Sequence, residues 1–404
     1  MANMTDASGP QLLFLSSQLP YPPHKGGVGI SWRMVKYFSQ HFSTAVICVL
    51  KGEDPQHSEA FQQALSLHSF YGHPLDIGRS LVTVGKSYLQ NRPINLVRNA
   101  HPHIGKKVSE LAESGCVILV DHYEMFQYIQ PGFANRTILH THNAEYLMWQ
   151  RYSELTESTL RRMAAKKESQ RIYRQEKSYY SRADQVWAFP NDKVLIDEMT
   201  DGKAATEAMY PIGEDGLLAM PDLQWEDTEK SLLYVGTLSW EANADGLHHF
   251  LRKVWPQLLQ SHPDLQFYIA GTGEDERLKV YEESPNIHFL GFVEDLEVYF
   301  KKCRVLVAPL RFGSGIKLKV FNTLMRGLPI VTTPVGAEGL PVQHGVHLMI
   351  GAQASGMARS IQLLLENASS WEQIRDQSRA LARKELAATT QLERMRETIS
   401  AFSQ

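Results

Sequence analysis

The chain has 404 residues, of which 43% are apolar and 21% are charged, an ordinary balance for a globular protein with a sizeable core. This length predicts two or three domains, at roughly 100–200 residues per domain. The formal net charge of −3 gives no reason to expect nucleic acid as a partner, because proteins that bind it are usually strongly basic.

The three cysteines are widely spaced and lie in or beside apolar runs, which favours buried thiols in a reducing compartment over disulfides or a zinc site. The first ten residues lack the pattern of a signal peptide, and no apolar run approaches about 18 residues. We therefore expect no transmembrane helix and a cytoplasmic protein.

The N-terminal half begins as a parallel α/β unit. Short apolar runs predict strands covered on both faces, at residues 12–16, 44–50, 116–120, 137–139 and 185–189. Apolar residues at helical spacing lie between the first two runs, namely Trp32, Val35, Phe38 and Phe42. The stretch 202–226 is irregular and contains prolines and glycines, so it is the predicted domain linker.

A long charged helix is expected at 153–181, with many lysines and arginines between residues 160 and 177. Two interpretations stay open for this segment, a solvated helix and peripheral contact with the inner face of the membrane. The interspersed Glu168 and Glu176 weaken the second one.

The C-terminal half repeats the alternation of strand and helix. Predicted strands occupy residues 232–235, 265–270, 286–290, 304–309 and 329–332. One helix is expected at 247–259, and the last stretch, 370–402, is helical and charged. This pattern predicts a second doubly wound α/β domain. The expected domain limits are 1–215, 216–386 and a C-terminal helix in 387–404.

Ligands of open parallel sheets bind beyond the carboxyl ends of the strands, so loops that follow strands are the candidate sites. The first such loop contains Lys25, Gly26 and Gly27. Its backbone N–H groups and the helix that follows could hold a phosphate or a sugar hydroxyl. A plain β–α turn explains it equally well, because the loop fits neither a G-x-G-x-x-G nor a Walker A motif.

The second loop, which follows the strand at 137–139, contains His140, His142, Asn143 and Glu145. Two histidines two residues apart could bind a metal, but no further cluster of histidine, cysteine or aspartate has ligand spacing. A polar cluster that contacts a ligand is the favoured interpretation, and hydrogen bonds within the loop are the alternative.

The third loop, residues 311–319, follows a strand and opens a helix. Glycines, a helix N-terminus and the two lysines Lys317 and Lys319 converge there. A pyrophosphate needs backbone donors, a helix dipole and cationic charge, so this loop is the predicted diphosphate site. The alternative is a solvated basic helix start.

These motifs together resemble a bacterial retaining glycosyltransferase of the GT-B fold, in the group 1 class (family 4). The resemblance covers nearly the whole chain and is most specific in the C-terminal half. It rests on Tyr234–Leu238, Ile269–Gly273, Leu290–Val293, Ala308-Pro309 and Gly313–Gly339, and in the N-terminal half on Pro20–Pro23, Lys25–Gly27 and His142–Glu145.

The resemblance implies two Rossmann-like doubly wound domains that face each other across a cleft. The C-terminal domain would bind a UDP- or GDP-sugar, and the N-terminal domain would bind a glycan or lipid-linked acceptor. A hexosyl transfer with retention, without a required metal or other cofactor, would serve surface polysaccharide or glycoconjugate synthesis. The C-terminal helix would cross back to the N-terminal domain.

Site residues follow from the same resemblance. Catalytic roles fall to His142, Lys319 and Arg311. Donor contacts fall to Gly26, Gly27, Gly236, Thr237, Gly271, Gly313, Ser314, Gly315, Ile316, Lys317 and Asn322. The acceptor side comprises Lys25, His140, Asn143 and Glu145.

The chain departs from the family pattern at the donor site. The class usually carries two glutamates, one for the donor sugar and one for the ribose, and Ser314 and Asn322 stand at those positions. Thr237 and Asp245 stand near the usual arginine and lysine. Arg311, Lys317 and Lys319 are the predicted replacements for that positive charge.

Three alternatives remain. A non-catalytic GT-B subunit that binds glycan or a partner enzyme is motivated by the two missing glutamates. A nucleotide-sugar epimerase would convert donor without acceptor. A nicotinamide dehydrogenase with two Rossmann halves would need a G-x-G-x-x-G fingerprint and a downstream acid, which the sequence lacks.

Overall fold

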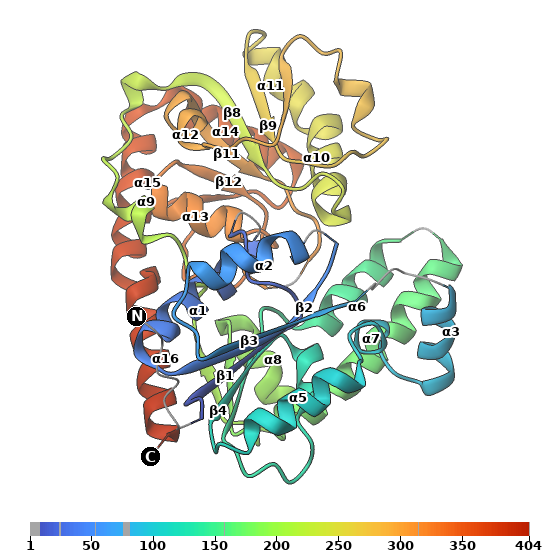
Figure 1. Cartoon of the computed structure of the whole chain (residues 1–404). Coiled ribbons are helices and arrows are strands. Elements are labelled where there is room, and N and C mark those ends of the chain that lie inside the picture. Colours follow the sequence, from blue (N-terminus) through green and yellow to red (C-terminus); the bar gives the residue numbers. More distant parts are fainter. Residues whose placement is uncertain are drawn as a thin grey trace. The chain divides into compact units, whose positions relative to one another are not determined.

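The computed structural model describes residues 9–23, 26–52, 54–75, 81–156, 158–313 and 315–403. These residues form two compact units. The first contains the chain up to Ile212 and from Thr390 onward, and the second contains Gly213–Thr389. Each unit holds a parallel sheet flanked by helices (Figure 1). Lys25 and Ser314, two of the predicted site residues, lie outside the described residues.

The described residues of the first unit form a seven-stranded sheet in the order β3-β2-β1-β4-β5-β6-β7, and every pairing in it is parallel. Its strands are β1 (Leu12–Ser16), β2 (Thr44–Leu50), β3 (Ser69–Pro74), β4 (Val117–Asp121), β5 (Thr137–His140), β6 (Gln185–Ala188) and β7 (Thr206–Ala208). The strand order reverses between β1 and β4. In register, Ser16 at the end of β1 lies beside Asp121 at the end of β4.

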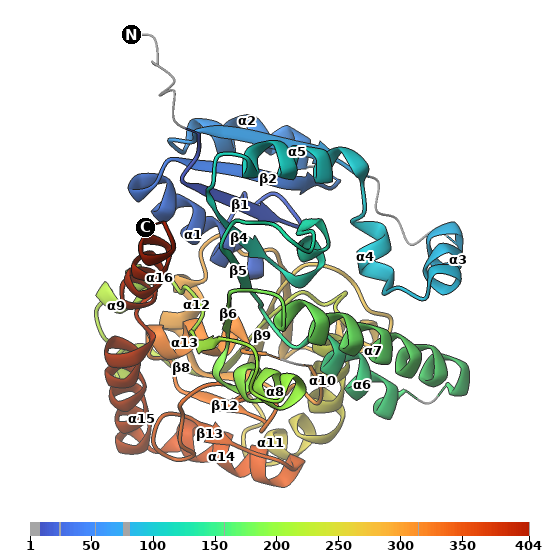
Figure 2. The same cartoon turned by 90° about the horizontal axis from the view of Figure 1, so that it is seen from below.

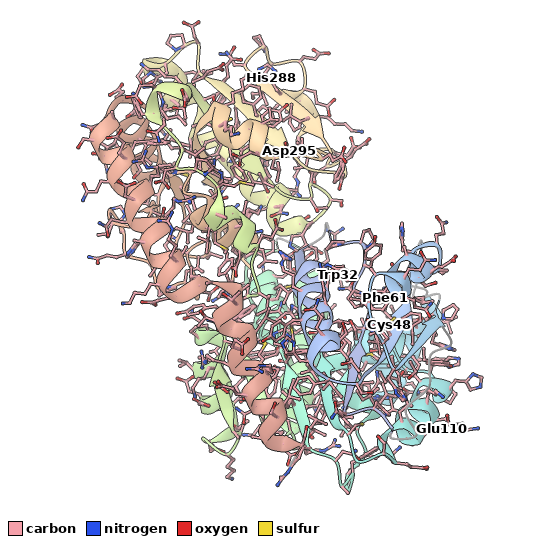
Figure 3. All side chains as sticks on the ribbon, turned by 60° about the vertical axis from the view of Figure 1, so that its left-hand side comes forward. Trp32, Cys48, Phe61, Glu110, His288 and Asp295 are labelled. Carbon is pink, nitrogen blue, oxygen red and sulfur yellow. The ribbon has the colours of Figure 1, made fainter. Side chains whose placement is uncertain are left out.

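Helices cover both faces of this sheet, because right-handed crossovers to either side of β1 place them there. The helices are α1 (Gly26–His41), α2 (Asp54–Gln63), α3 (Leu81–Gln90), α4 (Ile94–Arg98), α5 (Pro102–Ala112), α6 (Glu145–Leu155), α7 (Thr159–Tyr180) and α8 (Pro190–Thr200), with a 3-10 turn at Tyr123–Tyr128. The helices α6 and α7 pack side by side (Figure 2). In Figure 3, Trp32 of α1 lies near Phe61 of α2, with 6.0 Å between their ring centroids, and Cys48 is buried in β2.

The last helix, α16 (Ala388–Phe402), belongs to the first unit from Thr390 onward. Arg394 lies 2.6 Å from a carboxylate oxygen of Glu207, beside β7. The side chain of Gln391 accepts a hydrogen bond of 3.1 Å from the backbone N–H of Tyr210. These contacts attach α16 to the end of the sheet that β7 forms.

The described part of the second unit repeats the same topology with six parallel strands, in the order β10-β9-β8-β11-β12-β13. Its strands are β8 (Glu229–Val235), β9 (Gln266–Ala270), β10 (Ile287–Gly291), β11 (Cys303–Ala308), β12 (Ile330–Thr332) and β13 (Met349–Ile350). Its helices are α9 (Asp215–Ala219), α10 (Glu241–Lys253), α11 (Trp255–Ser261), α12 (Glu297–Lys302), α13 (Leu318–Arg326), α14 (Ala354–Glu366) and α15 (Ala368–Leu381), followed by a π-helical turn at Ala382–Leu386. Here the order reverses between β8 and β11.

The predicted fold class is confirmed, since both units are doubly wound α/β domains. Two predicted helices are wrong in their limits. The helix expected at 153–181 is α7, which begins only at Thr159, and residues 153–155 end the preceding helix α6; Ser158 caps α7 by accepting a hydrogen bond from the N–H of Arg161. The helix expected at 247–259 is a pair of helices, because Pro256 lacks an N–H group and fits the first turn of a new helix.

Three strands, β3, β7 and β13, were not predicted from the sequence. The strands β3 and β7 are partly exposed and lie at the two edges of their sheet, and β13 has only two residues. None of them carries the continuous apolar run that marks a strand buried on both faces. Among the described helices, none combines the length and the apolar character that crossing a bilayer requires.

Arg326 connects three parts of the second unit and fixes the C-terminal end of α13. Its guanidinium contacts both carboxylate oxygens of Glu297 on α12, at 2.7 and 2.6 Å, and donates to the carbonyl of Pro221 at 2.9 Å. The Arg326 side chain is only 1% exposed. Removal of one partner from such a buried pair leaves the other charge without compensation.

We expect Arg326→Ala to lower the free energy of unfolding by about 3 kcal/mol, because Glu297 would lose its buried donor. Lys301→Ala is the matched control. The Lys301 ammonium lies 3.7 Å from the same carboxylate but is 66% exposed, so its loss should change stability by less than about 0.5 kcal/mol. Urea unfolding of both variants measures the difference, and equal midpoints would contradict the assignment.

Candidate functional site

The points of strand reversal in the two sheets carry the predicted loops. In the first unit, α1 with Gly26 and Gly27 follows β1. In the second, Gly236 follows β8, and the loop with Lys317 follows β11. In doubly wound sheets, ligands bind in the crevice that opens at this reversal. Each unit is therefore described from its own reversal point.

Asp121, at the end of β4, is the centre of a histidine cluster in the first unit. Its fully buried carboxylate lies 2.8 Å from Nδ1 of His140 and 2.7 Å from Nε2 of His142. The Nδ1 atom of His122 lies 3.3 Å from its other oxygen, which also accepts a hydrogen bond from Ser31 Oγ. One carboxylate thus holds three imidazoles at the strand ends.

The charges within the cluster differ between its members. Although burial acts in the opposite sense, the neighbouring histidines hold the pKa of Asp121 well below its usual range. Burial opposes the charged form of His122 too, but the charge of Asp121 outweighs it and raises the pKa of His122 to about 9. Burial and the charge of His122 lower the pKa of His142 to about 3. At neutral pH, a neutral His142 therefore stacks on a charged His122, with 4.0 Å between ring centroids.

The neutral His142 has one acceptor, Nδ1, with no hydrogen bond to another described residue. Its Nε2 atom donates to Asp121, which fixes the tautomer and leaves Nδ1 without a proton. A Cβ atom built on Gly27 would lie 3.5 Å from that Nδ1 atom. The nitrogen therefore lies against the first turn of α1, where backbone N–H groups lack partners within the helix. A group with a pKa near 3 is a weak general base, so the arrangement suits a hydrogen bond from a hydroxyl group.

The turn that carries His142 is fixed by buried carboxylates. Glu176 of α7 accepts hydrogen bonds from the backbone N–H groups of Glu145 and Tyr146, at 2.9 and 3.3 Å. Asp192 of α8 accepts one from Ala144 at 3.1 Å. Both carboxylates satisfy N–H groups that the start of α6 leaves open. The turn is therefore held in place from two other helices.

Glu145 opens α6, and burial together with the charge of Glu124 raises the pKa of its carboxyl group to about 7. The side chain of Asn143 forms a hydrogen bond with it. Glu145 is therefore partly protonated at neutral pH and can both donate and accept. The structure thus brings Gly27, His140 and His142 together, and it places Asn143 and Glu145 on the adjoining turn.

Lys319 occupies the reversal point of the second unit. Its ammonium lies 2.9 Å from Asn243 Oδ1, 3.2 Å from the Tyr234 hydroxyl and 4.4 Å from the centre of the Tyr234 ring. Among the described residues it has no carboxylate partner within 4 Å. Burial and the charge of Lys317 lower the pKa of Lys319 to about 7. A Cβ atom on Gly236 would lie 2.5 Å from the ammonium, so the lysine reaches this position without displacement because residue 236 is a glycine.

The loop before α13 supplies further charge and backbone curvature. Gly313 and Gly315 have positive φ angles of 133° and 68°, which favour glycine. The Lys317 ammonium donates to the carbonyl of Gly315 and lies 3.6 Å from Glu338. Arg311 pairs with Asp245 at 3.1 Å. Of the three cations predicted to serve a diphosphate, Lys319 alone lacks an acidic partner within the described residues.

Asn322 lies three residues after Lys319 on α13, so the two side chains share one face of the helix. Its Oδ1 atom is buried, and it has no hydrogen-bond partner among the residues that the structure describes. An acceptor buried without a donor is costly and marks a place where a ligand donor fits.

The other predicted donor residues surround this point. The carbonyl of Thr237 accepts a hydrogen bond of 2.9 Å from Asn243, the residue that also contacts Lys319. A side chain at Gly271 would overlap the carbonyl of Gly236. Ile316 is buried beside the loop. Gly236, Thr237 and Gly271 thus lie together near Lys319, and their roles remain predictions.

Three members of the histidine cluster, Ser31, Asp121 and His122, are not among the site residues predicted from the sequence. A signal is present for two of them, because Asp121 and His122 directly follow a predicted strand, as His140 and His142 do. Glu176 is not among the predicted site residues either, and it is fully buried within the charged helix. Asp121, His122 and His142 further offer metal-ligand atoms within 4.8 Å of one another. A metal there would have to replace their shared hydrogen bonds.

Residues 229–367 match the sequence family described as glycosyl transferases group 1. A protein of Klebsiella pneumoniae, described as an uncharacterized 44.6 kDa protein in the cps region, is 23% identical over 377 residues. That match covers 90% of this chain and 93% of the Klebsiella protein.

Solved structures are similar over almost the whole chain. Sucrose-phosphate synthase of Thermosynechococcus elongatus has a TM-score of 0.69 at 16% identity, covering 97% of this chain and 98% of its own. HepE of Anabaena, solved in complex with UDP, has a TM-score of 0.69 at 15% identity, covering 97% and 100%. These likenesses show the fold, and the family match lies in the second unit. The second unit therefore contains a domain of the group 1 glycosyltransferase family, and the chain as a whole has the GT-B fold of these structures.

Proposed function

We propose that the chain transfers a hexose from a UDP- or GDP-sugar to a glycan or lipid-linked acceptor in bacterial surface polysaccharide or glycoconjugate synthesis. The relative in a cps region of Klebsiella supports the pathway, and the complex of HepE with UDP supports the donor class. Transfer would proceed with retention and without a required metal or other cofactor. A lipid-linked acceptor would be consistent with a transferase that acts in the cytoplasm, at the inner face of the membrane.

The observation that carries this proposal is the ammonium of Lys319. It is a partly buried cation with two neutral partners, next to Gly236 and the N-terminus of α13. A diphosphate would supply the missing negative charge, and the backbone donors of the helix start would bind its oxygens. Lys317 would add a second cation once the ligand competes with Glu338 for it.

Catalysis would then consist of charge stabilisation and positioning. Breaking the bond between sugar and phosphate leaves negative charge on the diphosphate, and preorganised cations and N–H groups stabilise that charge. In a retaining reaction of this kind, the donor phosphate itself assists the attacking hydroxyl. His142 Nδ1 would accept a hydrogen bond from the acceptor hydroxyl and orient it, which its low pKa permits.

A thermal-shift screen of nucleoside diphosphates and their sugars tests the proposal. A ligand that binds the folded state raises the melting temperature by mass action, so UDP or GDP and one of their sugars should do so. If no nucleotide or nucleotide-sugar gives a shift, the proposal is wrong. Binding without hydrolysis or transfer would favour the non-catalytic subunit, which the replacements at Ser314 and Asn322 motivate.

Lys319→Ala should weaken binding of the diphosphate ~10–100-fold, because hydrogen bonds between charged groups contribute about 1.5–3 kcal/mol. In the free wild-type protein the pKa of Lys319 is about 7, and a bound diphosphate would raise it. Wild-type affinity should therefore fall as pH rises above 7, by roughly ten-fold per pH unit at most. Titration calorimetry at pH 7, 8 and 9 measures both effects.

Lys253→Ala is the matched control for this experiment, because Lys253 is an exposed lysine at the end of α10 in the same unit. It should bind as the wild type does and keep the decline with pH. Equal affinities for Lys319→Ala and Lys253→Ala would show that Lys319 does not contact the diphosphate.

Asn322→Ala should weaken binding of UDP roughly five-fold, since an ordinary hydrogen bond contributes about 1 kcal/mol. Asn322→Glu should tighten the binding of UDP, because an ionised acceptor forms a stronger hydrogen bond than a neutral one. The positive charge of Lys319 lies three residues away on the same helix. One of the two analogues, 2′-deoxy-UDP or 3′-deoxy-UDP, lacks the hydroxyl that Asn322 would contact. Neither substitution should change the affinity of the protein for that analogue. A loss that is equal for UDP and both deoxy analogues would contradict a ribose contact.

A further inference from the structure

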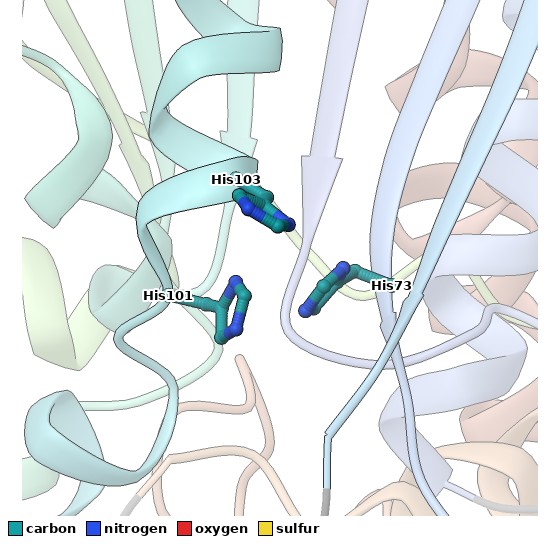
Figure 4. Close-up of side chains that lie close together, drawn as sticks. All are labelled: His73, His101 and His103. Carbon is teal, nitrogen blue, oxygen red and sulfur yellow. The ribbon is translucent and has the colours of Figure 1, made fainter.

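A second group of histidines lies in the first unit, outside the cluster around Asp121. It comprises His73 near the end of β3, His101 before the first turn of α5, and His103 within that turn. The three imidazole rings converge on a common space between the end of β3 and the start of α5 (Figure 4). They come from two segments that are about 30 residues apart in the chain, so the fold brings them together.

The geometry matches a metal-ligand set. One ring nitrogen of each histidine lies within 4.8 Å of the others. The ring centroids of His73 and His101 are 4.0 Å apart, and those of His101 and His103 are 5.0 Å apart. A tetrahedral zinc ion needs about 3.3 Å between ligand nitrogens, given Zn–N distances of about 2.0–2.1 Å. Small rotations of the side chains close that difference.

The backbone that carries two of these ligands is held rigidly. The N–H group of His101 donates to the hydroxyl of Tyr128 at 2.9 Å, and Tyr128 donates in turn to the carbonyl of Asn99. Pro102 occupies the first turn of α5, where its fixed φ angle suits the helix. His101 and His103 are therefore presented from a fixed helix start, and His73 comes from a strand of the sheet.

The cluster is chemically incomplete without a ligand. The Nδ1 atom of His101 is buried and has no hydrogen-bond partner among the described residues. Within the described part of the chain, no carboxylate forms an ion pair with any of the three. Ring nitrogens from three histidines, one of them without a hydrogen-bond partner among the described residues, form a set that a transition-metal cation can bind.

We propose that His73, His101 and His103 bind a divalent transition-metal ion of the zinc class, with water in the remaining position. Imidazole nitrogen suits zinc, cobalt, nickel and copper, whereas magnesium and calcium prefer oxygen ligands. The exposed His103 leaves the ion a path from solvent. The Tyr71 hydroxyl, 3.4 Å from Nδ1 of His73, would orient that ring.

This site is separate from the cluster around Asp121. Three strand spacings separate β3 from β4, the strand that ends at Asp121, which corresponds to about 14 Å. The residues proposed to bind the donor belong to the second unit. The metal would join the edge strand β3 to α5 and stabilise that edge, and it takes no part in the proposed transfer.

Equilibrium dialysis against Zn²⁺, followed by metal analysis, tests the proposal on the full-length protein. Wild type should bind one equivalent and show a higher melting temperature in Zn²⁺ than in Mg²⁺. His103→Gln, a change at an exposed side chain, should lower the zinc affinity at least ~10-fold, because even changes behind the ligands cost 10–100-fold. The Co²⁺ form should show visible absorption that is lost in the same variant.

His68→Gln is the matched control, since His68 is an exposed histidine of the same unit outside both clusters. It should bind zinc as the wild type does. Zinc binding that persists in His103→Gln, or that disappears in His142→Gln, would overturn the assignment. Nucleotide shifts should be the same in His103→Gln and wild type, so the metal site and the proposed transfer can fail independently.

Discussion

In a parallel sheet, every connection must return over one face before the next strand begins, so all strands end at the same edge. This constraint determines where chemistry can gather in both units. In the first, it places the ends of β4 and β5 together, and with them Asp121, His140 and His142. In the second, it places Gly236, after β8, beside Lys319, after β11. His73, near the end of β3, lies on that same edge of the first sheet.

The two reversal points have opposite electrostatic character. In the first unit, one buried carboxylate is shared by three imidazoles, and its charge is balanced inside the protein. In the second, a lysine is surrounded by a hydroxyl, an amide and the face of an aromatic ring, and its charge is left unbalanced. A balanced cluster can orient a neutral hydroxyl, and an unbalanced cation attracts an anion. This difference parallels the proposed division between acceptor and donor.

Much of the fold could be predicted because buried parallel strands are continuous apolar runs. The limits of β1 and β2 agree with the apolar runs at 12–16 and 44–50, while the partly exposed β3 and β7 carry no such run. Sequence spacing also pointed to the loop of Lys319, since glycines and a helix start are local features. Contacts between distant segments were out of reach. Glu176 caps α6 from the last turns of a basic helix, and His73 meets His101 only through the packing of α5.

The lowered pKa of Lys319 has a consequence for selectivity between anions. With a pKa of about 7, the side chain of the empty protein is charged for only about half of the time at neutral pH. A chloride ion or a singly charged phosphate gains little binding energy from such a group, and neither ion can easily keep Lys319 protonated. A multiply charged ligand can keep Lys319 protonated, because it stabilises the ammonium while it binds. In the proposed transfer, the burial of this one lysine would therefore favour ligands that carry more than one negative charge.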